Sequence, residues 1–267
     1  MDSAIKAGEF IRKDGTQYEY DRIADRKRVD FIAGVLQGGL PAGAHILDVG
    51  CGNGVISRHL GRLGFQVLGI DVSEKTIEKA RSATSLPNVT FQQKSAEELV
   101  ASGQRYDAVI CSEVLEHLTD PGALLKVLHS SLKEDGKLIV TVPNGSGPRE
   151  RFVTKPFLRM RSRNGWLWRT VNKLKSTLGY KGTTVQSAAD NLDHIQFFSK
   201  RDLEKLSREH HFRITKFGKA NFIEDVFPFS FFAKRVLFLQ KLDCMVADIL
   251  PTRFTGGFFS VWEKNRQ

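Results

Sequence analysis

Ile46-Leu47-Asp48-Val49-Gly50-Cys51-Gly52-Asn53-Gly54 is the stretch that decides the fold, together with Gln66-Val67-Leu68-Gly69-Ile70-Asp71 downstream of it. Each segment begins with an apolar run that is typical of a buried parallel strand. The first run passes into three glycines spaced by two, which let the backbone approach a bulky ligand with no Cβ in the way. The second run ends in Asp71, 21 residues after Gly50. A carboxylate there can accept hydrogen bonds from both hydroxyls of a ribose, so the pair predicts a nucleoside-binding crevice.

The residue before the glycines indicates which nucleoside binds. A dinucleotide-binding loop reads G-x-G-x-x-G and points a helix N-terminus at a pyrophosphate. This chain reads D-x-G-x-G-x-G from Asp48 to Gly54. The Asp48 carboxylate would repel a pyrophosphate, whereas it can attract the cationic amino-acid part of S-adenosylmethionine, directly or through water. The charge therefore favours S-adenosylmethionine over a nicotinamide dinucleotide.

Two later segments extend the pattern. They are Tyr106–His117 (YDAVICSEVLEH) and Lys133–Asn144 (KEDGKLIVTVPN). These two segments resemble the fourth and fifth strands of the class I S-adenosylmethionine-dependent methyltransferases, and the glycine-rich stretch resembles the cofactor loop of the same family. The resemblance covers about residues 44 to 144 well, and 191 to 218 and the C-terminus more loosely. It implies a methyltransferase with S-adenosylmethionine as its cofactor and S-adenosylhomocysteine as its product.

Within that class, the Glu113-x-x-Glu116-His117 element is similar to the branch that contains the ubiquinone-biosynthesis O-methyltransferases. The resemblance implies a Rossmann-like three-layer α/β/α sandwich. Its seven-stranded sheet would be mostly parallel, in the order 3-2-1-4-5-7-6 with the seventh strand antiparallel. The alternation of strands and helices along the chain independently predicts parallel pairing. We expect strands near 45–50, 66–71, 89–94, 105–111 and 137–142, a helix from Ser199 to His210, and a final antiparallel pair at 212–217 and 257–262.

Length and charge set the organisation. A chain of 267 residues can bury one substantial core. We expect an N-terminal helical cap over 1–43 and a methyltransferase domain over 44–267, with insertions at about 145–190 and 222–250. Between 149 and 181 there are ten Lys or Arg against one acid, giving +9 out of a net +10. Three cysteines without metal-ligand spacing, in a chain without a signal peptide, predict the reducing cytoplasm, and no run of about 18 uncharged apolar residues spans a bilayer.

Ten residues are candidates for cofactor binding. The glycine loop would form the floor, Asp71 would bind the ribose, and the backbone after the fourth strand would face the methionine part. Arg28 would pair with the cofactor carboxylate, as the resemblance implies. The family often has an acid that accepts from the adenine amino group, and Ser95 or the backbone of Ala96 stands at that place here. A structural interpretation is the alternative for each. The glycines would only form a tight turn that packs helix on strand, the acids would only precede helices, and Arg28 would be a solvated helix arginine. The candidates are Arg28, Asp48, Gly50, Cys51, Gly52, Asp71, Val72, Ser95, Ala96 and Ser112.

Glu113, Glu116 and His117 are spaced i, i+3 and i+4, which predicts one helical face. Such a set can hold Mg²⁺ or a similar cation, as the resemblance also implies, or His117 can act alone as a general base. A structural role for Glu116 and His117 beneath the cofactor loop is the alternative. His194, with Glu116, is a further catalytic candidate, and the alternative for it is a histidine that holds a lid.

The two insertions bear on partners. The basic 149–181 segment carries interleaved Trp and aliphatic residues, which predicts contact with an anionic membrane surface or an anionic substrate, and a solvated lid is the alternative. Nucleic acid ranks lower because no known RNA-binding module is present. Residues 222–250 are rich in Phe and predict a helix that lies in a membrane interface, covers a pocket or forms an oligomer contact.

The sequence thus predicts a cytoplasmic methyltransferase, peripheral on the membrane face, that acts on a hydroxyl of a small-molecule, lipid-linked or glycan-type acceptor. A C- or N-methyltransferase on a soluble metabolite and a non-catalytic S-adenosylmethionine-binding protein are the alternatives.

Overall fold

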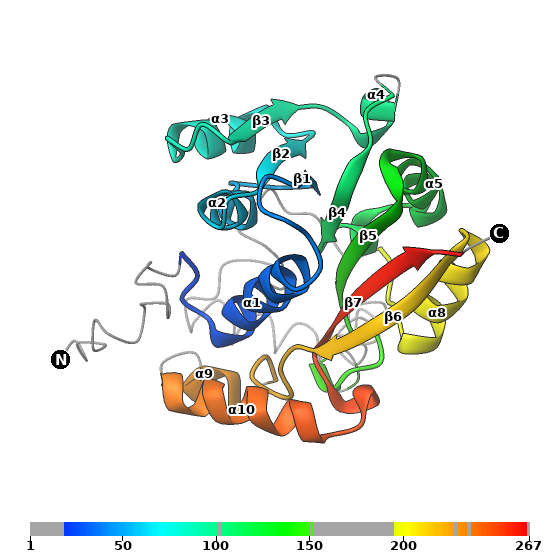
Figure 1. Ribbon diagram of the computed structural model, residues 1–267. Coiled ribbons are helices and arrows are strands. Elements are labelled where there is room, and N and C mark those ends of the chain that lie inside the picture. Colours follow the sequence, from blue (N-terminus) through cyan, green and yellow to red (C-terminus); the bar gives the residue numbers. More distant parts are fainter. Residues whose placement is uncertain are drawn as a thin grey trace, which may run out of the picture.

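The computed structural model describes residues 19–100, 103–149, 151, 195–226, 229–233 and 236–265. They form one seven-stranded sheet in the order β3-β2-β1-β4-β5-β7-β6, which confirms the predicted order (Figure 1). The strands are β1 (His45–Val49), β2 (Gln66–Asp71), β3 (Val89–Gln93), β4 (Tyr106–Ser112), β5 (Leu132–Pro143), β6 (Phe212–Lys219) and β7 (Gly257–Lys264).

Strand direction also follows the prediction. The first five strands pair in parallel, and β7 pairs antiparallel with both β5 and β6. The start of β5 differs from the expected 137–142, because Leu132 pairs with Tyr106 before a register shift brings Lys137 opposite Ala108. Because the first half of β5 is irregular, its apolar and polar residues do not alternate regularly, and the sequence pattern could not indicate where the strand begins.

Helices cover both faces of the sheet. On one face lie α1 (Ile23–Gln37), α2 (Val55–Arg62) and α3 (Glu74–Ser82), which pack against strand residues such as Ile46 and Ile110. On the other lie α4 (Ala96–Val100), α5 (Pro121–Ser131) and α8 (Lys200–Glu209), packed against their neighbours Leu47 and Val109. Successive strand residues thus enter opposite cores, as a strand buried on both faces requires. This confirms the three-layer α/β/α sandwich.

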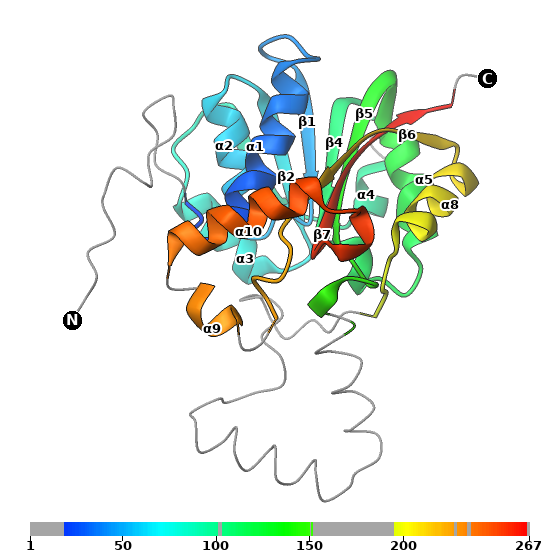
Figure 2. The same ribbon diagram turned by 90° about the horizontal axis from the view of Figure 1, so that it is seen from below.

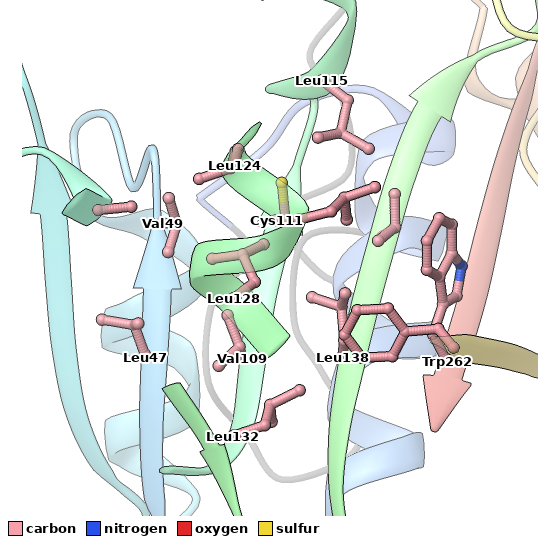
Figure 3. Close-up of a cluster of buried hydrophobic side chains, with 14 of the residues drawn as sticks. Leu47, Val49, Val109, Cys111, Leu115, Leu124, Leu128, Leu132, Leu138 and Trp262 are labelled. Carbon is pink, nitrogen blue, oxygen red and sulfur yellow. The ribbon is translucent and has the colours of Figure 1, made fainter. Parts of the chain in front are cut away.

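Figure 3 shows the core beneath α5, where leucines of that helix meet apolar side chains of β1, β4 and β5. Trp262 of β7 closes one side of this cluster and is fully buried. Its indole N–H donates to Ser260 Oγ at 2.8 Å, and its ring meets Phe212 of β6 edge-on. Because the buried N–H has a partner, the tryptophan adds apolar area to the core without a desolvation penalty.

Two helix starts follow from the sequence. The Ser199 hydroxyl accepts from the Asp202 N–H at 3.3 Å while the Asp202 carboxylate accepts from the Ser199 N–H at 2.8 Å. These two hydrogen bonds form a capping box with Asp in place of Glu. Ser73 is the N-cap residue of α3, but its side chain makes no capping hydrogen bond.

In the described part of the segment between β6 and β7 lie two helices and a short turn. They are α9 (Phe229–Ala233), α10 (Leu237–Ile249) and the 3-10 helix η4 (Thr252–Phe254). The segment leaves and re-enters the sheet beside the carboxyl end of β5, where Pro143 pairs with Gly257 and Asn144 N–H donates to Gly256 O. Figure 2 shows α10 lying across α1 on this side of the molecule.

No helix within the described ranges is both long and apolar enough to cross a bilayer. The predictions about His194 and the basic 149–181 segment lie outside the described residues, apart from Arg149 and Arg151.

Candidate functional site

The glycine loop combines close packing with an open face. A Cβ on Gly50 would lie 2.5 Å from Val114 Cγ2, and one on Gly54 would overlap the Phe91 ring. These two glycines therefore let the loop pack against its neighbours, which is the structural role rather than the ligand-binding role. A Cβ on Gly52 would meet no atom of the described residues within 4 Å. The middle of the loop thus faces open space, as a loop that receives a ligand must.

Asp71 at the end of β2 is joined to this loop. Its carboxylate accepts the Gly52 N–H at 3.0 Å and the Ser73 N–H at 2.9 Å, and Cys51 N–H donates to Ile70 O at 3.0 Å. Each carboxylate oxygen can accept more than one hydrogen bond. The half-buried Asp71 therefore keeps acceptor capacity beside the open face of the loop, where the sequence placed the ribose.

Val72 follows Asp71 and is 73% exposed. An exposed valine directly after a ribose-binding carboxylate, at the carboxyl end of a parallel strand, suits a flat apolar ring such as adenine. The other adenine candidates are engaged or buried. Ser95 N–H donates to Glu98 Oε2 at 2.7 Å, Glu98 N–H donates to Ser95 Oγ, and Ala96 is buried. The Ser95 hydroxyl thus caps the start of α4, and the backbone of Ala96 is left as the adenine candidate.

Asp48 lies beneath the loop. Its side chain is buried and accepts the Ser57 hydroxyl of α2 at 2.6 Å. Burial, together with the charge of Asp71, raises the pKa of Asp48 to about 7 against the effect of the hydrogen bond from Ser57. Any attraction of Asp48 for a cationic ligand therefore acts across the loop rather than by direct contact.

A hydrogen-bonded chain crosses the carboxyl end of β4. Thr141 Oγ1 donates to Glu113 Oε1 at 2.8 Å, so the hydroxyl of Ser112, 2.8 Å away, must donate to Thr141. Arg28 Nη1 lies 3.5 Å from the same Glu113 oxygen, and Arg28 Nη2 lies 3.2 Å from Asp25. The chain joins β4, β5 and α1 at the place where the methionine part of the cofactor was predicted.

Arg28 is the arginine of α1 that reaches this place. Arg22 instead pairs with Glu224 and Asp225, and Arg26 donates to the Tyr20 carbonyl. Arg28 is mostly buried, lies over the Tyr20 ring, and its Nε has no hydrogen-bond partner among the described residues. A buried guanidinium with an unused donor at a ligand site is suited to bind a carboxylate.

The predicted common face of Glu113, Glu116 and His117 is wrong. Leu115–His117 is a short 3-10 helix, η2, and Glu113 precedes it with φ of 57°, which turns the backbone away from a helical path. The Glu113 carboxylate faces Arg28 and Thr141. No three His, Cys, Asp or Glu side chains in the described parts of the chain are grouped to hold a metal ion. The three residues therefore do not fit Mg²⁺, and the metal-site prediction is corrected.

Glu116 and His117 form a pair instead. Glu116 is 1% exposed, and neither carboxylate oxygen has a hydrogen-bond partner among the described residues. Burial first, and the charge of Glu113 second, raise the pKa of Glu116 well above its usual value. His117 Nε2 lies 3.9 Å from Glu116 Oε1. The Glu116 carbonyl accepts the N–H groups of Ile195 and Gln196, which brings the residue after His194 to this site.

Two residues that support the site, Thr141 and Glu19, were not identified from the sequence. Thr141 links Ser112 to Glu113, and Glu19 forms ion pairs with Arg58 and Arg62 of α2. Arg58 also donates to Asn53 O within the glycine loop. Thr141 lies inside an apolar strand and Glu19 in a polar lead, so neither had a local signal that separated it from its neighbours.

Comparisons with known proteins agree with this geometry. A family model described as a methyltransferase domain matches residues 18–216. Over 120 residues the chain is 40% identical to the ubiquinone biosynthesis O-methyltransferase of Xanthomonas axonopodis pv. citri, covering 44% of this chain and 49% of that protein. The chain thus spans about half the length of the curated relatives it matches.

Solved structures share the fold. The magnesium protoporphyrin IX methyltransferase of Synechocystis with bound S-adenosylhomocysteine matches with a TM-score of 0.53 and 20% identity, over 91% of this chain and 84% of that one. The 1,6-didemethyltoxoflavin-N1-methyltransferase of Burkholderia thailandensis matches with a TM-score of 0.55 and 17% identity, over 92% and 80%. With the family model over most of its described residues, the chain belongs to the methyltransferase-domain family, that of the class I S-adenosylmethionine-dependent methyltransferases.

Proposed function

We propose that this protein transfers the methyl group of S-adenosylmethionine to a hydroxyl of a small-molecule, lipid-linked or glycan-type acceptor. The observation that carries the proposal is the pair of buried Glu116 and half-buried His117 at the carboxyl end of β4, beside the Arg28–Glu113–Thr141 chain. The names of the curated relatives support a hydroxyl as the acceptor group.

The cofactor side follows from the loop and Arg28. The open face at Gly52 takes the adenosine, Asp71 accepts from the ribose and Val72 covers the adenine. Arg28 directs its unused donor at the cofactor carboxylate. When bound, the cofactor supplies an electrophilic methyl group on a sulfonium. Because displacement at that carbon needs an in-line nucleophile, much of the rate gain comes from positioning.

On the acceptor side, His117 removes the hydroxyl proton. A neutral imidazole is suited to this role near neutral pH. The positive charge that then forms on His117 lies beside the Glu116 carboxyl, with Nε2 3.9 Å from Oε1, and an ionised Glu116 would stabilise it because opposite charges attract in a buried site. The Glu116 carbonyl also holds the backbone of Ile195 and Gln196. His194, next to Ile195, is the second candidate for a catalytic group in this proposal.

We also propose that the protein works in the cytoplasm at the membrane face. The charge of the 149–181 segment supports this, because basic residues are attracted to anionic lipid headgroups.

The test is turnover with a panel of phenolic, lipid-linked and glycan hydroxyl acceptors, with amine acceptors alongside. His117→Ala should lower kcat by about a hundredfold or more while the calorimetric Kd for S-adenosylmethionine changes less than about twofold. His45→Ala is the matched control, since His45 is exposed at the opposite end of β1.

Full activity of His117→Ala would remove His117 as the base. Methylation of the amine acceptors alone would replace the O-methyl assignment with N-methylation. Binding heat without transfer to any acceptor would leave a non-catalytic S-adenosylmethionine-binding protein.

A further inference from the structure

Helix α10 has two faces of different character. Gln240, Asp243, Cys244 and Ala247 are buried against the rest of the protein. The outer face carries large apolar side chains at spacings of four, three and four residues, which places them in one stripe along the helix. The stripe consists of Phe238 (69% exposed), Leu242 (45%), Met245 (64%) and Ile249 (86%).

The inner face is held by polar contacts that fix which side points outward. Gln240 accepts from Ile23 N–H and donates to Ala233 O, both at 3.0 Å. The Asp243 carboxylate accepts the N–H groups of Phe222 and Ile223 at 2.7 and 2.9 Å. A helix joined to α1 and to its own connecting segment in this way cannot turn its apolar stripe inward without breaking buried hydrogen bonds. The stripe is therefore a fixed outer surface of the folded chain.

The charge around the stripe is mostly basic, and the acid exposed beside it in α10, Asp248 (57% exposed), is paired. The two acids between 229 and 254 are both engaged with the protein, since Asp243 is buried and Asp248 pairs with Lys27 Nζ at 2.6 Å. Lys241 and Arg253 are exposed, and the sequence adds Lys234 and Arg235 between α9 and α10. An apolar stripe flanked by basic residues complements a surface that offers both hydrocarbon and negative charge. A second copy of the same surface would oppose basic residues to basic residues.

The position of the stripe relates it to the site. The segment from β6 to β7 starts and ends at the carboxyl edge of the sheet, where Asn144 donates to the carbonyls of Thr252 and Thr255. Figure 2 shows α9 and α10 on this side of the molecule, with α10 across α1. Helix α1 also carries Arg28 to the end of β4. Phe232 and Val236, both exposed, continue the apolar surface toward α9.

We propose that the apolar stripe of α10 docks this protein on an anionic lipid bilayer, with the helix lying in the plane of the headgroups. Phe238, Leu242, Met245 and Ile249 enter the boundary of the acyl chains, and Lys241 and Arg253 contact lipid phosphates. The docking itself does not depend on the proposed methyl transfer. That it brings the acceptor entrance to a lipid-borne hydroxyl rests on the proposed function.

The test is sedimentation of the full chain with vesicles of phosphatidylcholine alone and of phosphatidylcholine with about one-third phosphatidylglycerol. The double variant Phe238→Ser/Ile249→Ser should lower the partition coefficient on the anionic vesicles by about tenfold or more, because two large apolar side chains no longer leave water. Both positions are exposed, so circular dichroism and the Kd for S-adenosylmethionine should match those of the unsubstituted chain.

A pair of charge variants tests the second half of the proposal. Lys241→Glu on α10 should weaken binding to the anionic vesicles by more than about fivefold. Lys205→Glu, an exposed position on α8, is the matched control and should change binding less than about twofold.

Three results would overturn the docking proposal. The first is equal partitioning of the double variant and the unsubstituted chain. The second is equal binding of both vesicle types. The third is a dimer in light scattering without lipid that Phe238→Ser/Ile249→Ser converts to a monomer, because the stripe would then bind a second copy. Loss of docking with unchanged turnover of a soluble acceptor would leave the proposed methyl transfer intact. Docking without methyl transfer to any acceptor would reject the proposed methyl transfer and leave the docking proposal standing.

Discussion

Replacing Asp48 with asparagine should stabilise the protein more as the pH rises. Burial raises the pKa of Asp48 from 3.8 to about 7, so between these values the folded chain binds this proton more tightly than the unfolded chain does. Stability falls with rising pH wherever the folded state binds more protons. At about 1.4 kcal/mol per pH unit, Asp48 removes up to about 4 kcal/mol from the free energy of unfolding by pH 7, and the loss then levels off. Asparagine keeps the shape of the side chain and does not titrate.

The assay is urea unfolding followed by far-UV circular dichroism from about pH 5 to pH 8, extrapolated linearly to water. The difference in unfolding free energy, Asp48→Asn minus the unsubstituted chain, should rise with pH and reach a plateau above about pH 7. Asp107→Asn is the control. Burial raises the pKa of Asp107, but hydrogen bonds from Lys133 and the His45 N–H outweigh burial and hold that pKa below 3.8. The difference in unfolding free energy for Asp107→Asn should therefore stay constant over this pH range. A difference for Asp48→Asn that is also constant would refute the reasoning.

Three further predictions concern the cofactor crevice. Asp71→Asn should raise the calorimetric Kd for S-adenosylmethionine about tenfold, because charge-assisted hydrogen bonds to the ribose are weakened; an unchanged Kd would exclude the ribose role. Gly54→Ala should lower the free energy of unfolding by about 2 kcal/mol or more, since φ is +77° and the new Cβ overlaps the Phe91 ring, and equal midpoints in urea would contradict this. Arg28→Met should weaken cofactor binding about tenfold in the same calorimetric titration, and retained affinity would assign Arg28 a structural role only.

Much of the fold was predictable because the local signals agree with the tertiary structure. The second strand was expected at 66–71 and is Gln66–Asp71, and the third was expected at 89–94 and is Val89–Gln93. In both, a short apolar run is bounded by turn residues, and the same residues are buried in the folded chain. The capping box at Ser199 was equally local, because its two partners are three residues apart.

The site was less predictable because its geometry depends on backbone turns and on contacts between distant segments. Glu113 adopts φ of 57°, a region that a residue with a side chain rarely occupies, so the helical spacing of the Glu-x-x-Glu-His element was misleading. Arg28 meets Glu113 only because α1 packs over the end of β4. The residue spacing of the sequence carries no information about such a contact.

Both segments that interrupt the regular alternation leave the sheet at one end. One follows β5, and the other connects Lys219 to Gly257 next to it. The residues that hold the two cores lie in the layers behind this edge. Under the proposed function, we expect exchange of these segments to change acceptor preference. A chimaera that receives 220–256 from a relative should take on the donor's acceptor preference, while the strand order and the two cores stay the same.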